Sequence, residues 1–221
     1  MIAQSSATAE IGGTSSAADG TDLRLQTLSA FPETSGETPA AEIDQTIADW
    51  VRSYLMRPHP ELGRPGAVCP FTAVAARVNA IRVGSTRVRA QPSIDRAMRE
   101  ALAAFESIEC AKGQRHLRTV IVGFPNCGDE EGRARLKNAR NRLRFESILR
   151  GKMFALFEPN SQDEGLLNPE FRPLRSPLPL LAIRMLVEHD APFVVRNPLL
   201  APIYLMKFPL TGARKLWSAL W

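Results

Sequence analysis

Apolar residues recur at three- and four-residue spacing in several stretches of the chain, the pattern typical of a helix with one buried face. In residues 93–108 this stripe is complete and comprises Ile94, Met98, Ala101, Leu102, Phe105 and Ile108. A similar stripe begins at Ile43 and continues through Ile47, Trp50, Val51 and Tyr54 or Leu55. The spacing predicts helices over 41–56, 71–80, 93–108, 131–151 and 197–208, the last of them beginning after the start of its segment and broken or kinked by Pro202.

Short apolar runs bounded by turn-forming residues alternate with these helices and predict strands. They cover 81–89, 117–125, 152–159 and 179–188. The order after residue 80 is therefore strand, helix, strand, helix, strand, strand, helix. This order favours an α+β or α/β fold, in which one mixed β-sheet is packed with helices. We expect a single domain over 41–221, because a chain of 221 residues is short for two.

Residues 1–40 have few large apolar side chains and are rich in serine, threonine, alanine and glycine. Ordering such a stretch costs conformational entropy with little burial in return, so we expect a disordered tail in which only "LRLQTLSAF" (23–31) would dock. The tail carries one basic and five acidic residues, which leaves a net charge of +9 on the rest of the chain. A basic body favours anionic partners.

The spacing of the cysteines and the hydropathy of the chain indicate the cellular compartment in which we expect the protein. Cys69, Cys110 and Cys127 are widely spaced, and no CxxC pair occurs. This argues against a structural zinc site and a disulfide framework, and it fits a reducing cytoplasm. The chain shows neither a run of about 18 apolar residues nor the pattern of a secretory signal. We therefore expect a cytoplasmic protein without a membrane span.

The segment "HPELGRPGAVCPF" (59–71) gathers rigid and reactive residues. Prolines and glycines give it a shaped backbone of low entropy. If Cys69 lies just before the 71–80 helix, the helix dipole favours its thiolate, and His59 is near enough in sequence to serve as its base. Alternatively one of the two ligates a metal or haem iron, His59 being the metal candidate. The structural alternative is a rigid crossing in which Cys69 only fills the core.

A second candidate segment, 160–177, is long for a connection without secondary structure, and such loops are often functional. Asn160, Ser161 and Asn168 offer hydrogen bonds. Arg172 and Arg175 offer planar, permanently charged groups for a carboxylate or phosphate. The alternative is a solvated loop held by salt bridges.

Residues 133–144 hold six basic residues and no acidic one, and Arg133, Lys137, Arg140 and Arg144 share a helical face. Such a face could contact nucleic-acid phosphates. Because no interleaved aromatic residues suited to base stacking accompany it, a solvated face is the better interpretation and a nucleic-acid partner is not expected.

His116 and His189 are expected on the surface. The C-terminal Trp217 and Trp221 would pack on the body, form a dimer contact or touch a membrane, and the oligomeric state stays open.

Residues 59–71 and 151–193, "HPELGRPGAVCPF" and "GKMFALFEPNSQDEGLLNPEFRPLRSPLPLLAIRMLVEHDAPF", together resemble an uncharacterised bacterial family that is classed as a domain of unknown function. The likeness spans about 59–195. A fainter one is to the haem-dependent N-oxygenases that hydroxylate guanidines and amines. It is carried by "VCPF" (68–71), "MFALFEP" (153–159) and "RPLRSPLPLLAI" (172–183), which occur in that order.

The fainter resemblance implies a haem cofactor. Haem needs an axial ligand and cationic groups for its propionates. His59 or Cys69 would supply the ligand, and the other cofactor-binding candidates are Arg64, Asn160, Arg172 and Arg175. The leading hypothesis is then a cytoplasmic enzyme of specialised metabolism that oxidises a small nitrogen-containing substrate at haem. The alternatives are a cofactor-free enzyme with Cys69 as nucleophile and His59 as base, and a non-enzymatic binding protein for an anionic ligand or nucleic acid.

Overall fold

The computed structural model describes residues 22–32, 39–195 and 200–220. Within them, one mixed five-stranded sheet has the order β1-β2-β3-β5-β4. The strands are β1 (Gln26–Thr27), β2 (Ile81–Ser85), β3 (Thr119–Gly123), β4 (Lys152–Phe157) and β5 (Leu180–Met185). This confirms the predicted mixed sheet packed with helices.

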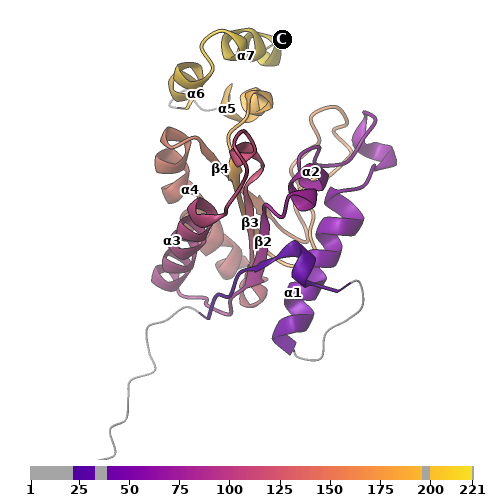
Figure 1. Cartoon of the computed structure of the whole chain (residues 1–221), viewed down its shortest axis with the longest axis vertical. Helices are drawn as coiled ribbons and strands as arrows, with labels where there is room; N and C mark the ends of the chain where they lie inside the picture. The colour runs from indigo at the N-terminus through magenta and orange to yellow at the C-terminus, as the bar shows by residue number, and fades with distance from the viewer. Residues whose placement is uncertain (1–21, 33–38, 196–199, 221) are drawn as a thin grey trace, which may run out of the picture.

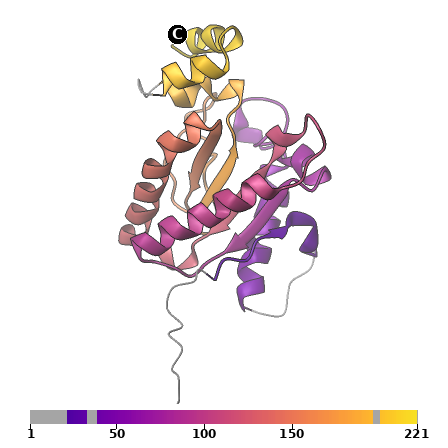
Figure 2. The same cartoon turned by 60° about the vertical axis from the view of Figure 1, so that its left-hand side comes forward.

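Helices cover both faces of this sheet (Figures 1 and 2). On one face lies α1 (Pro39–Trp50), which continues as a π-helical turn, η2 (Val51–Leu55). On the other face lie α3 (Gln91–Ser107) and α4 (Glu130–Leu149). Because α3 joins β2 to its parallel neighbour β3, and β5 runs antiparallel to both β3 and β4, strands β2, β3 and β4 share one direction. Their carboxyl ends therefore meet at one edge of the sheet.

The apolar stripes of the helices form the core that the sequence predicts. Ile94, Met98, Ala101 and Phe105 of α3 are buried against the sheet, as is Ile47 of α1. The helix predicted over 71–80 is shorter, since α2 covers only Thr72–Arg77. Burial of these stripes supplies the main driving force for folding.

The segment 22–32 is folded although it falls within the predicted tail. Strand β1 pairs antiparallel with β2, and Leu28 and Phe31 are buried in the main core. The chain passes so close to β2 that a Cβ at Gly84 would clash with the carbonyl oxygen of Arg24. The apolar residues of "LRLQTLSAF" therefore dock on the sheet, whereas 1–21 and 33–38 lie outside the described residues.

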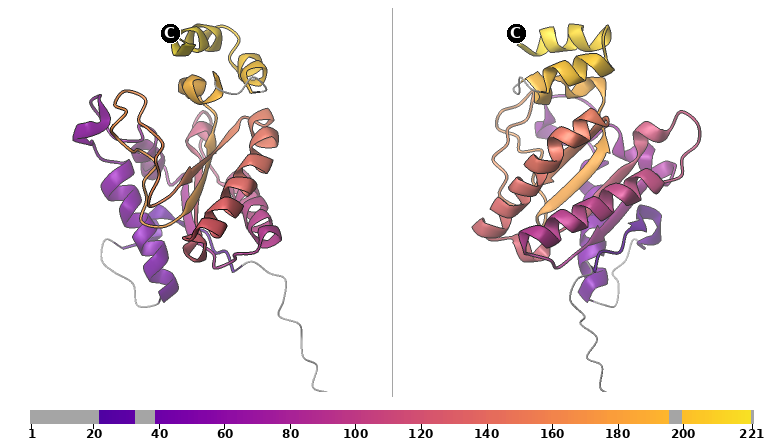
Figure 3. Two further views of the ribbon diagram at one scale, coloured as in Figure 1. Left: turned by 180° about the vertical axis from the view of Figure 1, so that it is seen from behind. Right: turned by 90° about the vertical axis from the view of Figure 1, so that its left-hand side faces the viewer.

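A C-terminal layer, defined here as helices α5 (Ala191–Val195), α6 (Ala201–Lys207) and α7 (Thr211–Leu220), forms one end of the molecule (Figure 3). It packs around a second cluster of buried residues, among them Leu186, Val194, Tyr204 and Leu216. The helix predicted within 197–208 is α6, which begins at Ala201. Pro202 stands in its first turn, where the missing N–H costs no helical hydrogen bond, so Pro202 starts the helix instead of kinking it.

Candidate functional site

The loop 58–67 is closed at its base like a hairpin. Pro58 and Ala67 form an antiparallel bridge, and the N–H of Val68 donates to the carbonyl of Arg57 at 2.9 Å. Inside the loop, Gly63 adopts a left-handed conformation with φ 75°. The Arg64 guanidinium donates to the carbonyls of Pro65 and Val68, at 3.1 Å each. Arg64, a cofactor-binding candidate from the sequence, therefore holds the loop in shape.

His59 and Cys69 have different hydrogen-bond partners. His59 lies just inside the loop, where its Nδ1 accepts the N–H of Glu61 at 3.2 Å. Cys69 lies at the base, where its N–H donates to the carbonyl of Leu55 at 2.9 Å. No hydrogen bond joins the two side chains among the described residues. Because α2 has only six residues and begins at Thr72, its dipole gives Cys69 little support.

The two candidate segments do lie side by side. Asn168 donates its side-chain N–H to the carbonyl of Glu61 at 2.8 Å. The rings of His59 and Phe171 have their centroids 4.6 Å apart. Leu167 packs so close to Gly63 that a Cβ there would lie 3.0 Å from the Leu167 Cβ. Segments more than a hundred residues apart in the sequence thus form one surface. The contacts that join them hold the two loops together and do not by themselves make a binding site.

Most polar groups of the 160–177 segment form hydrogen bonds within the segment. Arg172 donates to the carbonyl of Pro169, and to that of Phe171 at 3.3 Å. The carbonyl of Asn160 accepts from Gln162 at 3.0 Å, and the Asn160 side chain is exposed. Arg175 differs from them, because it is exposed and lines a groove.

This groove runs between α1 with its π-helical turn and the segment 175–177. Its volume is about 450 Å³, and its lining residues are Thr46, Asp49, Trp50, Ser53, Tyr54, Arg175, Ser176 and Pro177. The rings of Trp50 and Tyr54 are stacked, with centroids 5.9 Å apart and planes at 23°. The edge of Phe157 supports Trp50 from the sheet at 5.1 Å. One wall is therefore aromatic and preorganised.

Charged groups of opposite sign line the same groove. Arg175 donates through Nε to the carbonyl of Ser161 at 3.5 Å, and among the described residues its two terminal nitrogens have no hydrogen-bond partner. Asp49 is exposed and accepts from Gln45 at 2.8 Å and from Arg52 at 3.4 Å. Burial raises the pKa of Tyr54, and the positive charge of Arg175 opposes that rise. Tyr54 therefore stays a neutral donor, bonded at 3.4 Å to the carbonyl of Arg172.

Sequence reasoning found Arg175 but assigned Trp50 and Tyr54 to the buried face of a helix. Both aromatic residues are only half-buried. The available signal was their four-residue spacing at the end of the helix, which puts two rings on one face beyond the part that the sheet covers.

Comparison with known proteins places the chain in a family. A family model described as a domain of unknown function, DUF6875, matches residues 44–217. The chain belongs to the DUF6875 family. No curated protein and no solved structure matches it significantly. Among the described helices of this DUF6875 chain, none has the length and apolar character needed to cross a bilayer.

The residues predicted to hold haem do not fit that cofactor in this arrangement. His59 has its Nδ1 engaged and its ring packed on Phe171. Arg64 and Arg172 direct their guanidinium groups at nearby backbone carbonyls. Only Arg175 among the haem candidates lines the groove, and neither His59 nor Cys69 does. Haem needs an axial ligand and cationic groups that face one cavity, and the described residues do not bring the candidates together in that way.

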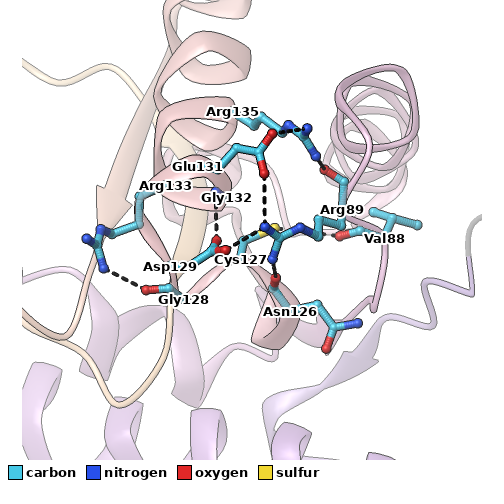
Figure 4. A network of polar contacts seen from close by, with 10 residues as sticks. All are labelled: Val88, Arg89, Asn126, Cys127, Gly128, Asp129, Glu131, Gly132, Arg133 and Arg135. Atoms are coloured by element: carbon cyan, nitrogen blue, oxygen red, sulfur yellow. Dashed lines mark hydrogen bonds and ion pairs between the residues drawn. The ribbon is translucent and has the colours of Figure 1, made fainter.

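Cys127 belongs to a polar cluster at the carboxyl ends of β2 and β3 (Figure 4). Arg89 donates to the carbonyl of Asn126 at 3.0 Å and bridges the carboxylates of Asp129 and Glu131 at 2.5 and 3.2 Å. The hydrogen bond from Arg89 lowers the pKa of Asp129, while burial raises the pKa of the Cys127 thiol. Cys127 is therefore a core thiol, and the cluster holds the start of α4 in place.

The basic face of α4 is partly neutralised. Lys137 lies 3.6 Å from the carboxylate of Glu158, and Arg133 lies 4.0 Å from it. This arrangement agrees with a solvated helix face rather than a row of cations aimed at phosphates. His116 and His189 are exposed, as predicted. Within the described residues, no three His, Cys, Asp or Glu side chains gather as metal ligands.

Proposed function

We propose that this DUF6875 protein binds a small molecule with a flat apolar body and a carboxylate in the groove beside α1. The observation that carries the proposal is Arg175, which lines the same groove as the stacked rings of Trp50 and Tyr54 and whose terminal nitrogens have no hydrogen-bond partner within the described part of the chain. A guanidinium binds a carboxylate through two parallel hydrogen bonds, and an aromatic wall stacks on a planar ligand. The groove volume of about 450 Å³ is in the usual range for small-molecule sites.

Asp49 extends the recognition to a nitrogen cation. Its carboxylate lines the groove and is exposed, so a protonated amine or guanidine on the ligand would find a partner there. A ligand with both charges, such as an aromatic amino acid, would use Asp49 and Arg175 together. This proposal combines the expected small nitrogen-containing ligand with the expected anionic one.

The lining residues favour binding over nucleophilic catalysis. The eight of them include neither histidine nor cysteine. The hydroxyl of Ser53 donates to the carbonyl of Asp49 at 2.6 Å, and that of Ser176 donates to the carbonyl of Leu178 at 2.7 Å. A hydroxyl nucleophile needs an adjacent base instead, so these serines shape the groove.

A titration with four indoles tests the proposal. Indole-3-propionate carries the ring and a carboxylate, tryptamine the ring and an amine, L-tryptophan both charges, and 3-methylindole the ring alone. Amide NMR shifts of the full chain locate each probe and give its Kd. We expect shifts confined to α1 and 175–177, with L-tryptophan binding most tightly.

Matched variants show which charged side chain binds which charged group of the ligand. Arg175→Gln should weaken indole-3-propionate by about tenfold or more, because a charge-assisted hydrogen bond contributes about 1.5–3 kcal/mol, and it should leave 3-methylindole unchanged. Asp49→Asn should weaken tryptamine and L-tryptophan and leave indole-3-propionate unchanged. Arg57→Gln is the control, since Arg57 is exposed and does not line the groove. Shifts elsewhere, or an equal loss in Arg57→Gln, would contradict the proposal.

The haem hypothesis is tested in the same protein with hemin as the probe. A saturable, stoichiometric Soret band that His59→Ala or Cys69→Ala removes would restore the oxygenase interpretation and overturn ours. A weak, non-saturating uptake that neither substitution changes would support the groove as the functional site.

A further inference from the structure

Arg52 joins the groove beside α1 to the N-terminal segment, defined here as residues 22–32. One terminal nitrogen of its guanidinium donates to the carbonyls of Leu28 and Phe31, at 2.8 and 2.6 Å. The other terminal nitrogen lies 3.4 Å from the carboxylate oxygen Oδ1 of Asp49, which lines the groove. One cation therefore stands between the backbone of the segment and the acidic group of the proposed binding site.

Gln45 makes the same connection one turn before Asp49 on α1. Its buried side-chain amide donates to the carbonyl of Pro32 at 2.7 Å and to Oδ1 of Asp49 at 2.8 Å. Gln45 and Arg52 thus share one oxygen of the carboxylate. Within the described part of the chain Oδ2 accepts no hydrogen bond, so this oxygen is available to a cation in the groove.

The distances show which acceptors hold Arg52 in this arrangement. Its two shortest bonds go to the segment, whereas its contact with Asp49 exceeds the usual range of about 2.7–3.2 Å for such a bond. Asp49 is also the more exposed partner, at 52% against 24% for the Arg52 side chain. Arg52 therefore neutralises Asp49 only weakly while the segment is docked.

Few contacts hold the N-terminal segment on the body. Strand β1 pairs with β2 over two residues, and the apolar anchors of the segment are Leu28 and Phe31. A short edge strand with so few pairs opens at a lower free energy than the central strands of a sheet. The segment can therefore leave its place while the rest of the sheet stays folded.

We propose that Arg52 is a positioning residue that makes the affinity of the groove for an amine depend on the docked segment. With the segment in place, Arg52 is bound to backbone carbonyls, and Asp49 binds the protonated amine. When the segment leaves, Arg52 pairs with Asp49, its neighbour three residues away on the helix. The groove then keeps Arg175 for a carboxylate and loses its partner for an amine. This inference rests on the proposed function, whose ligand class it makes conditional.

Phe31→Ser in the full chain tests the coupling, with tryptamine and indole-3-propionate as probes. Loss of the buried ring should undock the segment, which hydrogen exchange at β1 measures. Tryptamine should then bind about threefold more weakly, the effect of an exposed ion pair, while indole-3-propionate binds as before. Gly84→Ala displaces the same segment at Arg24 without removing a core side chain, so it should give the same selective loss.

Arg52→Met separates positioning from a structural role. It removes the cation that would pair with Asp49, so tryptamine should bind at least as tightly as it does to the unaltered protein. Adding Phe31→Ser should then change the tryptamine Kd no further. Arg57→Met is the matched control, because Arg57 is exposed and does not line the groove, and Phe31→Ser should keep its full effect in that background.

The outcomes distinguish this inference from the proposed function. If Asp49→Asn weakens tryptamine and undocking of the segment does not, the coupling is wrong and the groove stands. A loss of tryptamine binding in Arg52→Met as large as that in Phe31→Ser would also overturn the inference, because Arg52 would then act only by holding the structure. If neither indole binds the unaltered chain, the proposed function and the inference both fail.

Discussion

In the sheet body, apolar side chains from helices on both faces meet the strands in one continuous core, whereas the C-terminal layer packs around a separate and smaller cluster. The layer depends instead on a few polar contacts next to β5. The carboxylate of Asp190 accepts hydrogen bonds from both terminal nitrogens of Arg184, at 2.7 and 2.5 Å, and from the N–H of Val187 at 2.9 Å. The hydroxyl of Tyr204 donates to the carbonyl of Glu188. Because apolar burial in the body is spread over many residues, we expect a single substitution to destabilise the body less than the C-terminal layer.

The proposed binding site belongs to one of these regions only. The groove uses residues of α1, η2 and the 160–177 segment, and Phe157 packs on Trp50 from the sheet. None of the lining residues lies in α5, α6 or α7. Because the layer has its own small core, its attachment can change without altering the groove, and this separation is what the following substitutions examine.

The largest effect is expected from Asp190→Ala. Burial disfavours the charged guanidinium of Arg184, but the hydrogen bonds and charge of Asp190 outweigh it and raise the Arg184 pKa. Without Asp190, which is 2% exposed, the partly buried guanidinium of Arg184 loses its carboxylate partner and keeps only the carbonyl of Met185, at a cost of about 3 kcal/mol. Urea unfolding measures the free energy, and hydrogen exchange should show 186–217 losing protection before the strands do.

A control and a rescue decide how that loss is interpreted. Asp163→Ala removes an exposed carboxylate and should leave both measurements unchanged. Arg184→Met combined with Asp190→Ala should recover much of the stability, because it removes the unpaired charge as well. Equal loss of protection in the layer and in β2 and β3 would show that the two regions unfold as one unit.

Gly84→Ala tests the body in the same way. The new methyl group would clash with the backbone of Arg24, so the segment 22–27 must move away from β2, at a cost of about 1–3 kcal/mol. Hydrogen exchange should rise at β1 and the following residues while the C-terminal layer stays protected. Gly113→Ala is the control for a glycine with open space around it, although its φ of 89° adds local strain there. Faster exchange in α6 and α7 of Gly84→Ala would contradict the proposed independence.

Sequence patterns predicted the body well because its helices and strands have strong periodicity. The helix predicted over 93–108 is α3, and its stripe is buried as expected. Strand β1 was missed because it has two residues in a polar stretch, and its stability comes from pairing with β2 more than fifty residues later. Helix α7 was missed because its periodicity is divided between an inner and an outer face.

The candidate site shows the limit of local patterns more sharply. Arg175 was identified from its charge in a long loop. Trp50 and Tyr54 were not, because a helical stripe shows which residues share a face but not how far the sheet covers it. The contact between His59 and Phe171 depends on tertiary packing over a long sequence separation, so neighbouring positions in the sequence could not indicate it.

The smallest effect concerns Tyr204 and depends on pH. Burial, and then the negative charges of Glu188 and Asp190, raise the Tyr204 pKa from its usual 10.0 to about 12. The folded state therefore holds the phenolic proton more tightly than the unfolded state, and this contribution is complete below pH 10.0 and is lost as the pH rises toward 12. At neutral pH, Tyr204→Phe should cost about 1 kcal/mol for the lost hydrogen bond. Urea unfolding of both proteins should show this difference shrinking above pH 10.0, whereas a constant difference would mean that the hydroxyl ionises equally in both states and does not anchor the layer.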